Sequence, residues 1–259
     1  MRGWWREFSG LVLPVSCGGC GRAGTELCEA CAAQVYGGAP RRVRPESEPP
    51  GLPVVHAATG YEGAARAVLL AHKERGTLGM ARPLGRALAG AVRAGAVRVR
   101  DGRPLVLVPV PSARRTTAAR GHDPARRIAL AAAARLRRTG VPATVAAVLR
   151  QRRPVADQAE LTAAERRANL AGALDVVAGG GRLLAAGRVV LVDDLLTTGA
   201  TLAEAARALD AAGPGPCPER GAVVRHAAVV AASPLAFAAA CPVGPRNKPE
   251  LNPNLHRCR

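Results

Sequence analysis

The chain has 259 residues, of which 48% are apolar, and a formal net charge of +18. This size and apolar content allow one large domain, or one domain with an appendage. The sequence has no run of about 18 apolar residues, which excludes a typical transmembrane helix. Because its N-terminus, MRGWWREFSGLVLP, also makes a poor secretory signal, we expect a cytoplasmic protein without a membrane span.

Arginine carries almost all of the positive charge, because Lys73 and Lys248 are the only lysines. Together with abundant Ala, Gly and Pro, this indicates a general genomic bias. The charge is still uneven: from Arg114 to Arg153, eleven arginines accompany a single acid, Asp123. Such a segment could neutralise a pyrophosphate or a DNA backbone, or it could be a solvated basic face. The sequence alone leaves these alternatives open.

Residues 1–36 are predicted to hold a short N-terminal helix and a metal module. The module contains two C-x-x-C pairs, formed by Cys17, Cys20, Cys28 and Cys31. Four cysteines in this pattern suit a tetrahedral zinc site. Disulfides or a redox pair are the alternatives, but a cytosolic chain does not favour disulfides and a redox motif has no reason to be doubled. Because four thiolates leave no coordination position for a substrate, we expect this zinc to be structural.

Residues 37–53 are rich in Pro, Gly and charge, which predicts a linker. Within residues 54–240, short apolar runs typical of strands alternate with segments that have the apolar spacing of helices. We expect strands at 54–59, 105–108, 143–149, 189–192 and 223–231, and helices at 62–72, 77–93, about 120–138 and 201–209. Residues 149–173 form a polar excursion between two strands. This alternation predicts an α/β domain with a mostly parallel sheet flanked by helices. The tail at 241–259 is predicted to be disordered.

A proline-stiffened basic loop follows the strand predicted at 105–108. It contains a hydroxyl, backbone N–H groups and two arginines, which can grip phosphate in a bidentate way. This composition predicts a pyrophosphate clamp made by Ser112, Ala113, Arg114 and Arg115.

The segment RVVLVDDLLTTGATLAEAARALD at 188–210 predicts a buried strand, a polar turn and a helix. A loop that leads into a helix N-terminus can hold a phosphate. We assign this role, for a 5′-phosphate, to Thr197, Thr198, Gly199, Ala200 and Thr201. Asp193 and Asp194 are acceptors suited to ribose hydroxyls or to hydrated Mg²⁺. The pattern therefore predicts a ribose-5-phosphate site, and a well-capped strand–turn–helix unit without a ligand is the alternative.

The motif VVLVDDLLTTGATL resembles the phosphoribosyl pyrophosphate (PRPP) motif of type I phosphoribosyltransferases. Over residues 4 to 232, the chain resembles the ComF/GntX family of competence-associated proteins. The resemblance rests on CGGC…CEAC, on Tyr61 through Lys73, and on VPVPSARR, RGHDPARR, LRQRRPVADQAELTAAERRANLAGAL and the PRPP motif. The pattern of Gln158, Leu161, Arg166 and Asn169 distinguishes this family from purine or orotate phosphoribosyltransferases. One departure is RGHDP, where the family form has RGFNQ.

The resemblance implies a type I phosphoribosyltransferase-like fold that follows a Cys₄ zinc module. It implies PRPP and Mg²⁺ at Asp193 and Asp194, with Lys73 and Arg120 as contributors of positive charge. The implied function is phosphoribosyl transfer linked to DNA uptake, with the acceptor, the general base and turnover itself left open. The alternative is a non-catalytic accessory that binds single-stranded DNA and keeps a vestigial or regulatory PRPP site. Its partners would be the competence helicase and other DNA-uptake proteins. A docking protein that uses the zinc module is a third reading.

Overall fold

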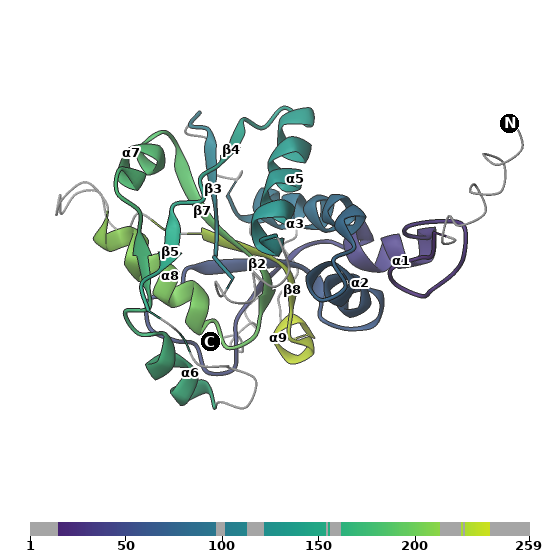
Figure 1. Cartoon of the computed structure of the whole chain (residues 1–259), viewed down its shortest axis with the longest axis horizontal. Coiled ribbons are helices and arrows are strands. Elements are labelled where there is room, and N and C mark those ends of the chain that lie inside the picture. Colours follow the sequence, from purple (N-terminus) through teal and green to yellow (C-terminus); the bar gives the residue numbers. More distant parts are fainter. Residues whose placement is uncertain are drawn as a thin grey trace, which may run out of the picture.

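The computed structural model describes residues 15–96, 102–112, 122–153, 155, 162–212, 224 and 226–238 (Figure 1). Several predicted features lie outside these residues: the helix at 1–13, the tail at 241–259, and the side chains of Ala113, Arg114, Arg115, Arg120, Gln158 and Leu161. The side chain of Arg166 is also outside the described part. The assignments that concern these residues stay predictions.

A six-stranded mixed sheet forms the centre of the domain, in the order β1-β2-β8-β7-β3-β4. The strands are β1 (Arg41–Val43), β2 (Val54–Gly60), β3 (Leu105–Pro109), β4 (Ala143–Val145), β7 (Arg188–Leu196) and β8 (His226–Ala232). Only β1 is antiparallel to its neighbour, and every other pairing in this sheet is parallel. The central strands are continuous apolar runs because helices cover both of their faces. The predicted α/β class with a mostly parallel sheet is confirmed.

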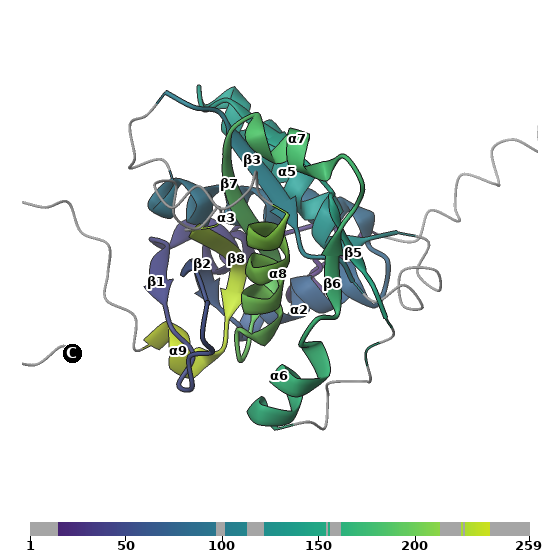
Figure 2. The same ribbon diagram turned by 90° about the vertical axis from the view of Figure 1, so that its left-hand side faces the viewer.

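Helices form a layer on each side of the sheet (Figures 1 and 2). The first layer holds α1 (Glu29–Ala32), η2 (Ala33–Gly37), α2 (Gly63–Lys73), η3 (Leu78–Met80), α3 (Ala81–Gly95) and α5 (Pro124–Arg138). The second holds α7 (Gly180–Ala185), α8 (Ala200–Ala211), α9 (Pro234–Ala238) and a separate hairpin of β5 (Leu149–Gln151) and β6 (Leu174–Val176). Helix α6 (Ala163–Leu170) contacts α8. None of the helices in the described ranges is long and apolar enough to cross a membrane.

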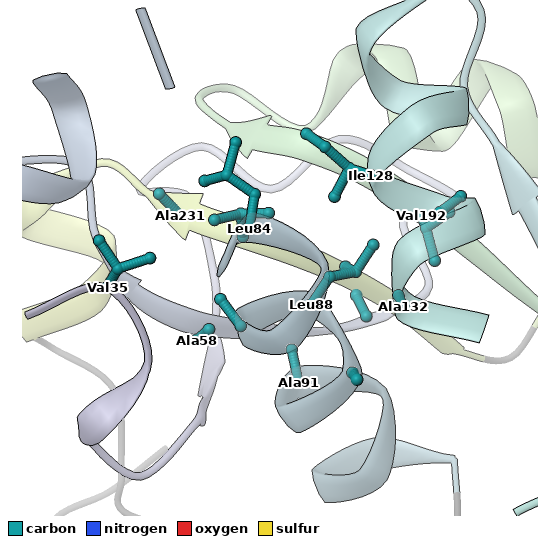
Figure 3. Close-up of a cluster of buried hydrophobic side chains, with 14 of the residues drawn as sticks. Val35, Ala58, Leu84, Leu88, Ala91, Ile128, Ala132, Val192 and Ala231 are labelled. Atoms are coloured by element: carbon teal, nitrogen blue, oxygen red, sulfur yellow. The ribbon is translucent and has the colours of Figure 1, made fainter. Parts of the chain in front are cut away.

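Small residues let α3 and α5 pack closely against each other and against the sheet (Figure 3). A Cβ atom at Gly85 would lie 2.5 Å from the Cβ of Ala131, so a glycine is needed where the two helices meet. Leu84 and Leu88 of α3 share this core with Ile128 of α5. With so few aromatic residues in the chain, the core is filled by Leu, Val and many alanines, and the backbones approach one another accordingly.

The linker and the strand expected at 143–149 both differ from the sequence prediction. Part of the predicted 37–53 linker is built into the sheet, because Arg41–Val43 forms the edge strand β1 and Val43 is buried. The single strand expected at 143–149 is two strands: β4 pairs with β3, whereas β5 turns away to pair with β6. The polar excursion is therefore a hairpin that carries α6 at its far end.

Candidate functional site

The order of the strands reverses between β3 and β7, which lie side by side. From β3 the chain passes through α5 to β4, at one edge of the sheet, whereas from β7 it passes through α8 to β8, in the opposite direction. Because the two crossovers leave in opposite directions, α5 and α8 lie on opposite faces. The loops that follow β3 and β7 therefore diverge at the carboxyl edge. Ligands bind at such a switch point in open α/β sheets.

Asp193 and Asp194 lie at this carboxyl edge of β7. The strand extends to Leu196, so both acids belong to the strand and not to the turn that the sequence predicts. The reason is that β7 continues to pair with β8 beyond the apolar run, with Asp193 opposite Val229. The backbone N–H of Asp194 donates to Oδ1 of Asp193 over 2.8 Å, which orients the Asp193 carboxylate against the backbone of its neighbour.

Lys73, the last residue of α2, meets the acidic pair. Its Nζ lies 3.0 Å from Oδ2 of Asp194, and the Asp194 side chain is 11% exposed. Burial and the neighbouring Asp194 carboxylate raise the pKa of Asp193 well above its usual range, and the Lys73 ammonium opposes this shift. Two acids thus share one observed cation. A further cation or a pair of hydroxyl donors would relieve their repulsion, and the oxygen donors suit Mg²⁺.

The loop between β7 and α8 is compact, and Gly199 is its turning point. Gly199 has a φ of +76°, which glycine adopts without strain. A Cβ at this position would lie 3.0 Å from Leu52 Cδ1, so residues of the predicted linker pack directly on the loop. No side chain in the described ranges caps the start of α8, whose Ala200 follows Gly199. The first N–H groups of this helix are therefore suited to an anion.

The loop after β3 starts next to these groups. The N–H of Val110 donates to the carbonyl of Val192 over 2.9 Å, so the loop leaves the sheet beside Asp193. Ser112, the predicted hydroxyl donor, is half-buried three residues after Pro109. The structure thus brings the start of the predicted pyrophosphate clamp to the same edge as the acidic pair and Lys73.

A histidine pair that was not predicted from the sequence lies beside Lys73. The rings of His72 and His122 are 5.7 Å apart, and burial lowers the pKa of His72. The next residue, Asp123, caps α5 by accepting from the N–H of Arg126 over 3.1 Å, and Pro124 is the first residue of that helix. Asp123 and Pro124 therefore have a structural role, because Asp-Pro is a strong helix start.

The four predicted metal ligands lie together near the N-terminus. The sulfur atoms of Cys17, Cys20, Cys28 and Cys31 are all within 4.8 Å of one another, and those of Cys20 and Cys28 are 3.7 Å apart. Four sulfurs at 2.3 Å from one zinc ion would lie about 3.8 Å apart, so this arrangement fits a tetrahedral ion. The N–H of Cys28 also donates to Sγ of Cys17 over 3.3 Å. The cluster could therefore hold a metal such as zinc.

The thiols of this cluster differ in their acidity. Burial acts to raise the pKa of Cys17, but N–H donors from Cys20, Cys28 and Gly19 outweigh it and lower the pKa to about 6. Burial and the neighbouring sulfurs raise the pKa of Cys31 to about 12. Negative charge is thus favoured on one sulfur and disfavoured on another that lies close to it, a conflict that a divalent cation would remove.

The cysteine cluster shares its core with the main domain. Cys17, Cys28 and Cys31 belong to the same buried cluster as residues of α2 and α3. A Cβ at Gly18 would lie 2.7 Å from Sδ of Met80, and one at Gly19 would lie 3.2 Å from Cβ of Ala64. Both glycines of the first C-x-x-C pair are therefore needed for close packing.

Glu204 is a buried acid on α8 that the sequence analysis missed. It accepts from the N–H of Leu174 over 3.1 Å and from Nε and Nη2 of Arg207, each over 2.8 Å. Arg207 also donates to the carbonyl of Leu174 over 3.1 Å. This clasp ties β6 to α8, and so holds the β5–β6 hairpin beside the helix that follows the acidic pair. The signal available in the sequence was an acid on an otherwise apolar helix face.

No family model matches the chain, and no curated protein matches it significantly. The function is therefore inferred from the residues and their geometry.

Proposed function

We propose that the carboxyl edge of β3 and β7 binds PRPP, and that the protein is a type I phosphoribosyltransferase-like member of the ComF/GntX family. The observation that carries this proposal is the strand reversal between β3 and β7. It puts the acidic pair, Lys73 and the start of the Ser112 loop at one edge of the sheet.

Each part of PRPP has a complementary group in this arrangement. The N-terminus of α8 and the hydroxyls of Thr197, Thr198 and Thr201 suit the 5′-phosphate. Asp193 and Asp194 suit the ribose hydroxyls, and Ser112 suits the pyrophosphate. Gly199 supports the first assignment, because its positive φ directs the chain into α8 without a side chain.

The two acids and the pyrophosphate group of the ligand would hold Mg²⁺. That ion would neutralise charge on the leaving pyrophosphate. Lys73 has a positioning role in the proposal: its ammonium lies 3.0 Å from Oδ2 of Asp194 and holds that carboxylate at the edge of the sheet.

A ligand series separates the parts of the site. Ribose 5-phosphate, pyrophosphate and PRPP, each with Mg²⁺, are compared by the thermal stabilisation they give to the zinc-loaded protein. We expect PRPP to stabilise most and ribose 5-phosphate to stabilise measurably. Equal stabilisation by pyrophosphate alone and by PRPP would contradict a ribose-phosphate site.

Transfer activity is tested separately, by pyrophosphate release from PRPP in the presence of nucleobases and amines. Release with one acceptor supports an enzyme. PRPP binding without release from any acceptor in a broad panel would restrict the proposal to a PRPP-binding protein. The link to DNA uptake rests on the ComF/GntX resemblance and belongs to the same proposal.

A further inference from the structure

Helices α3 and α5, which pack side by side, carry exposed arginines that the PRPP proposal does not use. Neither helix contains an acidic or an aromatic residue. Their exposed arginines are Arg82, Arg86 and Arg93 on α3, and Arg126, Arg137 and Arg138 on α5. We call these six residues the arginine face.

The arginines of α3 form one stripe along the helix. Arg82, Arg86 and Arg93 are spaced by four and seven residues, which places them on the same side of an α-helix. The opposite side holds Leu84, Leu88 and other buried residues that pack toward the sheet. The stripe therefore faces solvent, away from the sheet. On α5, Ile128 and Leu136 are buried, whereas Arg126, Arg137 and Arg138 are exposed over a broader part of the helix surface.

The exposed arginines of the two helices are held in a fixed relationship. The close approach of α3 and α5 at Gly85 and Ala131 sets the distance between the helices. Nη1 of Arg93 donates to Oγ1 of Thr139 over 3.3 Å, which joins the C-terminal ends of the two helices. Each helix has 15 residues, so each is about 22 Å long at 1.5 Å per residue. Figure 1 shows the pair side by side on one side of the sheet.

The charge of this face is not balanced by carboxylates. Among the residues that the structure describes, none of the six arginines forms an ion pair with an acid. Three have neutral contacts instead: Arg86 lies 4.2 Å from the centre of the Tyr36 ring, Arg93 bonds Thr139, and Arg137 donates to the carbonyl of Ala143 over 2.7 Å. These contacts orient the side chains without neutralising them.

We infer that the arginine face binds the phosphate backbone of duplex nucleic acid without reading its sequence. Duplex DNA carries about one negative charge per 1.7 Å of its axis, and arginine binds phosphate in a bidentate way. A single strand gains much of its affinity from base stacking on aromatic side chains, which α3 and α5 lack. Charge density therefore favours the duplex.

Other anionic partners suit this face less well. A membrane-bound helix needs a broad apolar side, and Leu130 is the only large apolar residue exposed on these two helices. A protein interface needs buried apolar or aromatic anchors near its centre, and Leu130 is again the sole candidate.

The test is fluorescence anisotropy of the full-length, zinc-loaded protein with a 20-base-pair duplex of arbitrary sequence and with one of its single strands. The variant Arg82→Gln/Arg126→Gln/Arg138→Gln removes three charges from the face. The control Arg22→Gln/Arg42→Gln/Arg182→Gln removes three exposed arginines from elsewhere. All six side chains are exposed, so both variants should fold, which circular dichroism verifies.

We expect the duplex to bind at least as tightly as the single strand. The face variant should lose at least tenfold in affinity, and the control less than threefold. The slope of log K against log salt concentration should fall in magnitude by about 2.7 for three lost phosphate contacts, at 0.9 per contact. Equal losses in both variants, preference for the single strand, or binding of anionic vesicles without binding of the duplex would each overturn the inference. Asp194→Asn should leave duplex binding unchanged, which separates this surface from the PRPP proposal.

Discussion

Nζ of Lys73 lies 3.0 Å from Oδ2 of Asp194, and this contact joins the end of α2 to the carboxyl edge of β7. It brings together two residues that are far apart in the sequence. It also supplies the cation observed beside the acidic pair.

Replacement of Lys73 by methionine should shift the pH dependence of PRPP binding. Lys73 lowers the pKa of Asp193, whereas burial and Asp194 raise it. Without the ammonium, the pKa of Asp193 rises further and the pair becomes fully ionised only at a higher pH. We expect the midpoint of affinity against pH to move upward in Lys73→Met. Lys73→Arg, which keeps the charge, should shift it less, and identical midpoints for wild type and Lys73→Met would contradict the assigned role.

Because the Lys73 side chain is 38% exposed, its effect on folding should be small. A partly solvated ion pair of this kind contributes about 1 kcal/mol or less. Urea unfolding should therefore separate the effect on the ligand from the effect on stability.

Gly199→Ala should damage the loop that leads into α8. Alanine is strained at a φ of +76°, and its Cβ would lie 3.0 Å from Leu52. The strain alone costs about 1–2 kcal/mol of unfolding free energy. We expect a loss of this size by urea unfolding, together with at least a tenfold loss of PRPP affinity by calorimetry.

Gly140→Ala is the matched control for Gly199→Ala. Gly140 has a φ of +77°, and a Cβ at this position would meet no atom within 4 Å, so this variant has the strain without the contact or the site. It should lose similar stability and keep PRPP affinity. Equal affinity losses in the two variants would count against a phosphate-binding role for the Gly199 loop.

Metal removal should destabilise the whole domain and not only the N-terminal segment. The cysteine cluster shares a core with α2 and α3, so loss of the ion exposes residues such as Met80. We expect one zinc per chain by mass spectrometry and a lower melting temperature after chelation. Unchanged melting of a zinc-free protein would argue against a structural ion.

Zinc affinity should also fall as the pH falls. The ion must displace protons from the thiols, and the pKa of Cys31 is about 12 in the metal-free cluster. Competition with a chromophoric chelator at several pH values measures this dependence.

Glu204→Gln should weaken the clasp between α8 and β6. The lost carboxylate accepts two hydrogen bonds from Arg207 and one from Leu174, and its replacement should cost about 2 kcal/mol. Although burial of Glu204 raises its pKa, the hydrogen bonds from Arg207 and Leu174 outweigh this and lower the pKa below the usual value of 4.5. The contribution is therefore present above pH 4.5 and is lost as the pH falls through the folded-state pKa.

Urea unfolding at several pH values between 7 and 3 checks this prediction. Glu204→Gln should show a weaker loss of stability on acidification than wild type. Arg207→Met provides a second variant, because it leaves the buried carboxylate without its cation. The double variant Glu204→Met/Arg207→Met should then be less harmful than the sum of the single changes. Strict additivity would mean that the two side chains do not act together.

The sequence predicts those parts of the fold that have a regular apolar pattern. Strands β2 and β3 and helices α2, α3, α5 and α8 were expected close to their observed positions. The cysteine cluster was predicted because ligand spacing is local. The short edge strand β1 has no such pattern. Its three residues lie in a segment between Pro40 and Pro45 that resembles a loop, and they pair as a strand because β2 lies beside them.

Non-local contacts account for most of what the sequence could not predict. The extension of β7 through Asp193 and Asp194 depends on backbone pairing with β8, which the polar side chains do not signal in the sequence. The sequence predicts Lys73 as a contributor of positive charge, but its contact with Asp194 follows only from the position of α2 relative to β7. Burial of the Glu204 carboxylate costs free energy that is offset only by its hydrogen bonds from Arg207 and from the N–H of Leu174.

Calorimetry of PRPP binding with Mg²⁺ tests the central claim most directly. Wild type, Asp193→Asn/Asp194→Asn and the surface control Asp175→Asn are compared in the zinc-loaded state. We predict binding by wild type and by the control, and at least a hundredfold loss in the double variant because the ribose and Mg²⁺ acceptors are gone. Absence of binding to a folded, zinc-loaded wild type, or unchanged binding by the double variant, would contradict the account.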